Sequence, residues 1–121
     1  MTKPKSISKG KKLAESGSRI QRVRLQKLIA DAIVDCYNES EEATGLFTML
    51  EENLSLPFRA TVLGMTVKVE KVDIDEGGTI VAVCSSNLRR QKVRILDLCL
   101  TDPPPAGAEW IEAYRLWMSR G

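Results

Sequence analysis

The sequence predicts an α+β fold: an N-terminal αα-hairpin, a small antiparallel sheet or SH3-like barrel of four to five strands, and a C-terminal helix. Two changes in periodicity indicate this order. Before Pro57 and after Gly107, apolar residues recur at spacings of three and four, which is typical of helices with one buried face. Between them, residues 57–101 alternate or run apolar with many β-branched residues, which is typical of strands. With 121 residues, the chain has room for one modest hydrophobic core.

The helical hairpin is expected over residues 19–56. Its first helix should span 19–37, because apolar positions repeat with helical spacing as far as Tyr37. Asn38, with Glu41 three residues later, has the spacing of a capping box and predicts the start of a second helix. This helix must end before the next proline. A glycine within it costs up to about 1 kcal/mol relative to alanine.

After this proline, short antiparallel strands are expected at 59–63, 66–74, 79–85 and 91–100. The segment Asp75-Glu76-Gly77-Gly78 predicts a hairpin turn. Three consecutive prolines stop the last strand, and a final helix should cover 107–119. One face of that helix should cover the open side of the sheet. Its apolar residues are Trp110, Ala113, Tyr114, Trp117 and Met118.

The charge is unevenly distributed along the chain. Residues 1–18 are rich in Lys, Ser and Gly, which predicts a flexible basic arm ahead of a single domain over 19–121. Residues 1–27 carry a charge of +8, residues 28–58 carry −7, and residues 59–121 carry +1. The net charge of +2 is therefore a cancellation of two opposed segments.

The composition argues against several classes of protein. The absence of histidine removes the commonest general base and zinc ligand, and we expect no enzymatic activity. Three cysteines are too few and too scattered for a disulfide framework, and we expect them to be small buried residues. No apolar run approaches the roughly 18 residues of a membrane span, and the N-terminus lacks the apolar segment of a signal peptide. We therefore expect a cytoplasmic protein without a membrane partner.

Seven carboxylates between residues 31 and 52, with no basic residue among them, form what we call the acidic block. They are Asp31, Asp35, Glu39, Glu41, Glu42, Glu51 and Glu52. A helical hairpin folds the chain back, so that acids near its corner converge. Because Ca²⁺ takes about six to eight oxygen ligands, the acidic block is a candidate calcium site. The alternative is a solvated helix face whose first-turn glutamates complement the helix dipole.

Two further segments have features of ligand sites. Residues 73–78 resemble part of a calcium loop, but Cys84 stands where such a loop needs a bidentate glutamate, and a hairpin turn is the better interpretation. The basic arm and a basic strand could contact phosphate. The basic residues of that strand are Arg89, Arg90, Lys92 and Arg94. Residues 59–100 include no aromatic side chain for stacking on bases, so a solvated tail and strand face is the alternative.

A series of short elements runs in a distinctive order through residues 30–118. The first group is Asp35-Cys36-Tyr37, Glu39, Glu41, Ala43-Thr44-Gly45, Leu50-Glu51-Glu52-Asn53-Leu54 and Leu56-Pro57-Phe58-Arg59-Ala60. The second group is Leu96-Asp97-Leu98, Pro103-Pro104-Pro105, Gly107 and Trp110-Ile111-Glu112-Ala113-Tyr114-Arg115-Leu116-Trp117. Together they resemble the CcbP-like family of small calcium-binding proteins, first described in cyanobacteria.

The resemblance implies calcium binding through acidic residues, without catalysis, as a buffer or sensor. The acids that match by position are Asp35, Glu39, Glu41, Glu51 and Glu52. Two positions depart from the family pattern. Ser40 stands where an acid is expected, which removes a candidate ligand, and Leu46 stands where an aromatic residue is expected, which alters packing beside the site.

The sequence leaves two functions open. The first is calcium binding through the acidic block. The alternative is a non-metal adaptor domain whose basic arm contacts nucleic acid or an acidic partner. In an intramolecular variant of this alternative, the basic arm folds over the acidic block of its own chain and competes with the cation for the carboxylates. Neither a protein partner nor an oligomeric state follows from the sequence.

Overall fold

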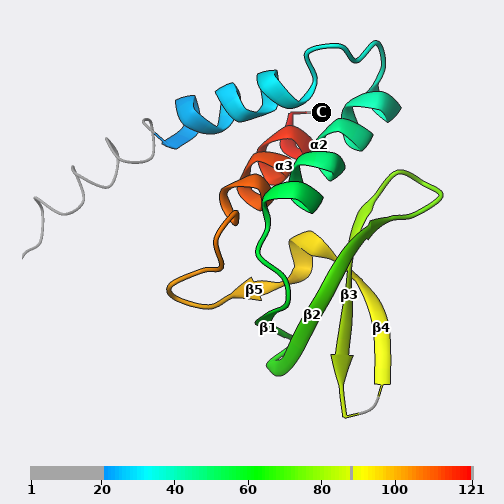
Figure 1. The fold of residues 1–121 in the computed structure, drawn as a ribbon, viewed down its shortest axis with the longest axis vertical. Helices are drawn as coiled ribbons and strands as arrows, with labels where there is room; N and C mark the ends of the chain where they lie inside the picture. The colour runs from blue at the N-terminus through cyan, green and yellow to red at the C-terminus, as the bar shows by residue number, and fades with distance from the viewer. Residues whose placement is uncertain (1–20, 88, 121) are drawn as a thin grey trace, which may run out of the picture.

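The computed structural model describes residues 21–87 and 89–120, in which helices pack against a five-stranded antiparallel sheet (Figure 1). The first helix covers residues 21–32 of the described chain, α2 spans Glu39–Asn53 and α3 spans Glu109–Ser119. The strands are β1 (Phe58–Val62), β2 (Met65–Ile74), β3 (Ile80–Ser86), β4 (Arg89–Arg94) and β5 (Cys99–Leu100). These elements confirm the α+β fold. Figure 1 shows the helices together at one end of the molecule, with the hairpins of the sheet extending away from them.

The first helix ends earlier than its periodicity predicts. Its helical residues stop at 32, and the chain turns at residues 33–35, where the Cys36 amide donates to the Ile33 carbonyl at 2.9 Å. Such a tight final turn satisfies one of the carbonyls that a helix end leaves without a partner. The expectation of a helix to residue 37 is therefore wrong. Tyr37, expected on the buried face, is 91% exposed.

The second helix starts at its predicted cap and ends before the proline. The Asn38 side chain accepts a hydrogen bond from the Glu41 amide at 2.8 Å. The Glu41 carboxylate accepts from the Tyr37 amide, also at 2.8 Å, so the reciprocal bond reaches one residue before the cap. Gly45 lies where α2 crosses the first helix, and a Cβ there would sit 2.5 Å from the Ala32 carbonyl oxygen. The close approach of the two helices therefore requires glycine.

The sheet has the strand order β4-β3-β2-β1-β5, so β4 and β5 are its two edges. The predicted strand over 91–100 is interrupted by a 3-10 helix at Ile95–Asp97, because Ile95 turns inward and is fully buried. The predicted hairpin turn joins β2 to β3, and Asp75 Oδ1 accepts from the amides of Gly77 and Thr79. These bonds confirm the interpretation of this segment as a turn.

The core lies between α2, α3 and one face of the sheet. Tyr114 of α3 is almost fully buried, and its hydroxyl accepts a hydrogen bond from the Ile80 amide at the start of β3, at 3.2 Å. This bond ties the last helix to the sheet. The expected apolar face of α3 is confirmed except for Met118, which is half exposed. Its buried members are Trp110, Ala113, Tyr114 and Trp117.

Three other expectations concern the chain as a whole. The predicted basic arm, residues 1–18, lies outside the described residues. Within the described part of the chain, no helix has the length and apolar character needed to cross a membrane. The three cysteines are free, as expected, but only Cys84 is buried, whereas Cys36 is half-buried and Cys99 is exposed.

Candidate metal centre

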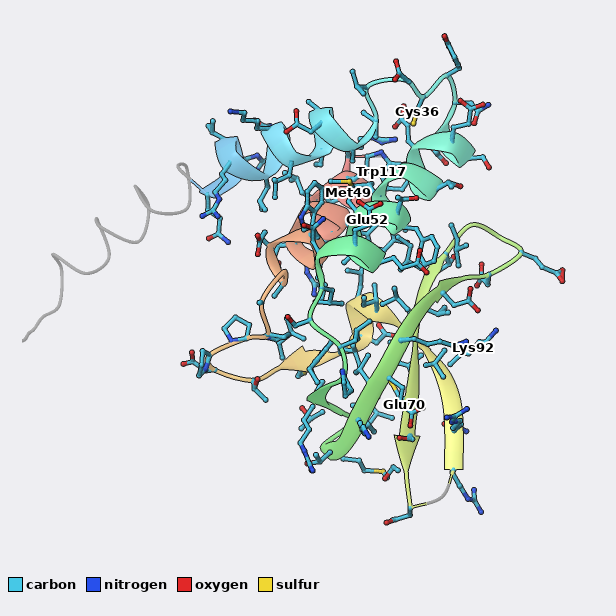
Figure 2. All side chains as sticks on the ribbon, in the orientation of Figure 1. Cys36, Met49, Glu52, Glu70, Lys92 and Trp117 are labelled. Atoms are coloured by element: carbon cyan, nitrogen blue, oxygen red, sulfur yellow. The ribbon has the colours of Figure 1, made fainter. Side chains whose placement is uncertain are left out.

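The structure divides the acidic block into separate groups. Four acids lie where the first helix turns into α2, and we call them the corner acids. They are Asp35, Glu39, Glu41 and Glu42. Glu51 and Glu52 lie some three turns further along α2, about 15 Å away at 1.5 Å per residue, and Asp31 is exposed on the first helix. Figure 2 shows Cys36 near the start of α2 and Glu52 toward its end. One ion cannot bind both groups.

Glu42 is the corner acid with the most defined surroundings. Its Oε1 accepts hydrogen bonds from Trp117 Nε1 at 2.8 Å and from Arg120 Nη2 at 3.2 Å. The same guanidinium lies 4.0 Å from Glu39 Oε2 and stacks over the Trp117 ring, 4.4 Å from its centre. The aromatic contact adds a cation–π attraction to the ion pair. A positive charge therefore already lies between two corner acids.

This basic neighbour of the corner acids was not predicted from the sequence. Arg120 lies 78 residues from Glu42 along the chain, so the acidic block contains no base in sequence but acquires one in space. One feature of the sequence pointed toward this arrangement. Trp117 and Arg120 are three residues apart, which places both side chains on the same side of a helix.

The corner acids also act together on a thiol. Cys36 Sγ donates to the Glu41 carbonyl oxygen at 3.3 Å. Partial burial of Cys36, followed by the negative charges of Glu41, Glu42 and Asp35, raises the pKa of the thiol. Because these carboxylates come from both sides of the hairpin corner, a cation placed there would meet the negative potential of all three.

A cavity of about 410 Å³ opens beside the first turn of α2. Glu39 and Ser40 line one side of it, and the β2–β3 turn at residues 75–79 lines the other. This volume is ample for an ion with water ligands, since a water molecule takes about 30 Å³ in the liquid. Ser40 therefore stands at the cavity wall, where an acid would have added a carboxylate.

The donor chemistry of the corner fits Ca²⁺, although the carboxylates do not converge as they stand. Within the described ranges, no group of three or more acidic or thiol side chains is close enough to hold one metal ion. Four carboxylates offer up to about eight oxygens, and Ca²⁺ takes about six to eight. Because Arg120 lies beside Glu42 Oε1 and Glu39 Oε2, an ion that used these two oxygens would compete with the guanidinium.

The comparison with known families supports one of the two functions that the sequence left open. A family model for calcium binding, CcbP, matches residues 26–118, more than three quarters of the chain. The chain belongs to the CcbP family. This assignment confirms the resemblance carried by the ordered elements of the sequence, and it makes calcium binding the function of this CcbP-family protein.

Two solved structures share the fold. CcbP of Anabaena is similar at 20% sequence identity with a TM-score of 0.68, over 85% of this chain and 92% of that chain. A calcium-binding protein in its calcium-binding form is similar at 19% identity with a TM-score of 0.65, over 84% of this chain and 91% of that chain. No curated protein sequence matches the chain.

The two positions expected to depart from the family pattern have different surroundings in this CcbP-family protein. Leu46 is fully buried in the core, so this substitution concerns the packing of α2. Ser40 is exposed at the second residue of α2, beside the corner acids. Only the departure at Ser40 bears directly on the number of carboxylates available to an ion.

Proposed function

We propose that this CcbP-family protein binds Ca²⁺ at the corner of the helical hairpin, through the corner acids, and acts as a buffer or sensor without catalysis. The observation that carries the proposal is the position of Arg120. Its guanidinium lies 3.2 Å from Glu42 Oε1 and 4.0 Å from Glu39 Oε2. The corner thus attracts a cation within the protein itself, and Ca²⁺ would take the same place with a larger charge.

Each corner acid has a distinct part in this proposal. Glu39, the most exposed of the ion-paired acids, and Glu42 supply the oxygens that now lie near Arg120. Glu41 is held by the Tyr37 amide, so it offers its second oxygen without leaving the helix cap. Asp35 lies in the turn that follows the first helix, and its charge acts on the thiol at the corner. The cavity beside Glu39 leaves room for water ligands.

Release of Arg120 from the corner acids would couple ion binding to a conformational change at the end of α3. The residue follows directly on α3, and its guanidinium covers the ring of Trp117. When Glu42 turns to an ion, both the guanidinium and the Trp117 indole lose their carboxylate partner. The end of α3 would then become freer to move, and this is the structural difference that a sensor could transmit.

The test compares charge removal at the two ends of α2. The variant Glu39→Gln/Glu42→Gln removes two corner acids, and Glu51→Gln/Glu52→Gln removes two charges from the same helix about 15 Å away. Calorimetric titration of the full chain with CaCl₂, and thermal melts in Ca²⁺ against excess chelator, report binding and stabilisation.

We expect the corner variant to lose most of the binding heat and of the Ca²⁺-dependent rise in melting temperature. The control variant should keep both. Loss of binding in the control with retention in the corner variant would place the site at the other end of the helix. If neither variant changes the titration, the ion does not depend on these four glutamates, and the proposed site is wrong.

A further inference from the structure

The outer face of the sheet, which points away from the core, carries rows of basic side chains. Residues that are opposite each other in neighbouring antiparallel strands share one face of the sheet. The register places three cross-strand rows on the outer face: Arg59-Lys68-Ser85-Arg90, Lys71-Val83-Lys92 and Asp73-Val81-Arg94. A bulge between Val69 and Lys71 lets Val69 and Val72 both face the core, while Lys68 and Lys71 both face outward.

This face has more positive charge than its own acids neutralise. It bears six basic side chains against three acids, Glu70 and Asp73 on the face and Asp97, which pairs with Arg94 at 3.1 Å; the net charge is +3. Arg90 pairs with Glu70 at 2.7 Å and Lys92 with Asp73 at 3.4 Å; Glu70 and Lys92 mark the face in Figure 2. No ion pair within 4.0 Å involves Arg59, Lys68 or Lys71 among residues 21–87 and 89–120. All three are exposed.

The side chains of the outer face indicate which class of negatively charged partner it suits. Its apolar residues, Val81 and Val83, are only 6% and 8% exposed; Val83 lies between Lys71 and Lys92, and Val81 lies between Asp73 and Arg94. The face therefore offers neither the aromatic or aliphatic anchor of a protein hot spot nor an apolar group to insert into lipid. It also lacks an aromatic side chain for stacking on unpaired bases.

We infer that the outer face binds the phosphate backbone of double-stranded nucleic acid, without reading its sequence. Rows of cations on neighbouring strands can face the regular array of phosphates on a duplex. Cationic side chains two residues apart on β4 lie about 6.6 Å apart, and neighbouring strands lie about 4.8 Å apart. Lysine and arginine on such a surface displace counterions condensed on the duplex, which provides affinity independent of base sequence. This inference is independent of the calcium site.

The expected salt dependence follows from the number of contacts. For B-DNA the logarithm of affinity falls with the logarithm of salt concentration, with a slope of about −0.9 per phosphate contact. The three cations without an ion pair correspond to a slope of about −2.7, and all six to about −5. Three contacts alone would weaken binding about 40-fold between about 50 and 200 mM salt.

The experiment measures fluorescence anisotropy of a short labelled DNA duplex titrated with the full chain, in excess chelator, over a series of salt concentrations. The face variant is Arg59→Gln/Lys68→Gln/Lys71→Gln. The matched control, Arg22→Gln/Arg24→Gln/Lys27→Gln, removes the same charge from exposed positions on the first helix. The N-terminal residues are present in both variants, so their contribution cancels from the comparison.

We expect the native chain to bind with a steep negative slope. The face variant should bind at least about tenfold more weakly at low salt, with a slope about 2.7 shallower, while the control stays within about threefold of native. If the triple variant fails to fold in a thermal melt, Lys71→Gln alone should make the slope about 0.9 shallower. Absence of binding at low salt, equal losses in both variants, or equal affinity for polyglutamate would each overturn the inference.

Because the titration is made in chelator, failure of nucleic-acid binding leaves the calcium proposal standing. In the same way, failure of the calcium titration leaves the outer face to be judged on its own.

Discussion

Replacement of Arg120 by glutamine tests the proposed competition between a side chain and the ion. The substitution removes the guanidinium that lies 3.2 Å from Glu42 and 4.0 Å from Glu39, and it leaves a shorter, uncharged polar side chain. If Ca²⁺ must displace this group, the free energy of Ca²⁺ binding is reduced by the free energy needed to break the contacts of Arg120. The variant Arg120→Gln should therefore bind Ca²⁺ more tightly than the native chain.

The magnitude follows from the exposure of the partners. The side chain of Arg120 is 44% exposed and that of Glu42 is 23% exposed, so the pair belongs with partly screened surface ion pairs. Such pairs contribute about 0.5 to 1 kcal/mol, and the contact with Glu39, which is 83% exposed, adds little. Removal of the competitor should raise Ca²⁺ affinity about two- to fivefold. The calcium-free protein should lose a similar amount of stability.

The assay is calorimetric titration with CaCl₂ beside tryptophan fluorescence, since the Trp117 indole donates to Glu42. The matched control is Arg115→Gln, which removes the same charge and the same kind of ion pair from α3, at 3.3 Å from Glu112. Unchanged or weaker Ca²⁺ binding in Arg120→Gln would refute the competition. An equal gain in Arg115→Gln would show that net charge, rather than position, controls affinity.

Three other outcomes are expected. The variant Gly45→Ala should lose about 1 to 3 kcal/mol of stability in urea unfolding, because its Cβ would meet the Ala32 carbonyl; a gain of about 1 kcal/mol, as helix propensity alone implies, would contradict the close approach. The variant Ser40→Asp should bind Ca²⁺ more tightly in calorimetry, because it adds a carboxylate at the cavity wall. Weaker binding would show that the cavity beside Ser40 is not part of the calcium site. A hydrogen bond from Ser85 lowers the pKa of Glu70 from 4.5, so its stabilisation is present above that pH and is lost as pH falls through the lower folded pKa. The variant Glu70→Gln should accordingly lose less stability than the native chain on acidification from about pH 5 to 3, and equal losses would contradict this.

Local patterns in the sequence predicted most of the fold correctly. Helical periodicity, the cap at Asn38 and the turn at residues 75–78 each depend on neighbours within a few positions, and the structure has all three. The errors occur where packing overrides the local pattern. The strand predicted to residue 100 breaks because Ile95 enters the core, and the first helix stops at 32 because the chain must turn toward the next cap.

For the proposed calcium site, the sequence predicted residue types and a region but not the geometry. The acidic block is a property of composition along the chain, and the family assignment agrees with the function inferred from it. Its division into corner acids and distant acids could not be predicted by charge counting, because it depends on the length of α2 between Glu42 and Glu51. The outer basic face likewise requires the register of four strands and the bulge before Lys71.

The sequence by itself determined the order of helices and strands, the concentration of carboxylates before residue 53 and the resemblance to a calcium-binding family, because these depend on residue type and spacing alone. The tertiary structure decided which charges meet. It brought Arg120 onto Glu42 across 78 residues and made glycine necessary at position 45. Contacts between distant segments have no local signature in a single sequence, and at this corner they place a guanidinium beside two of the carboxylates.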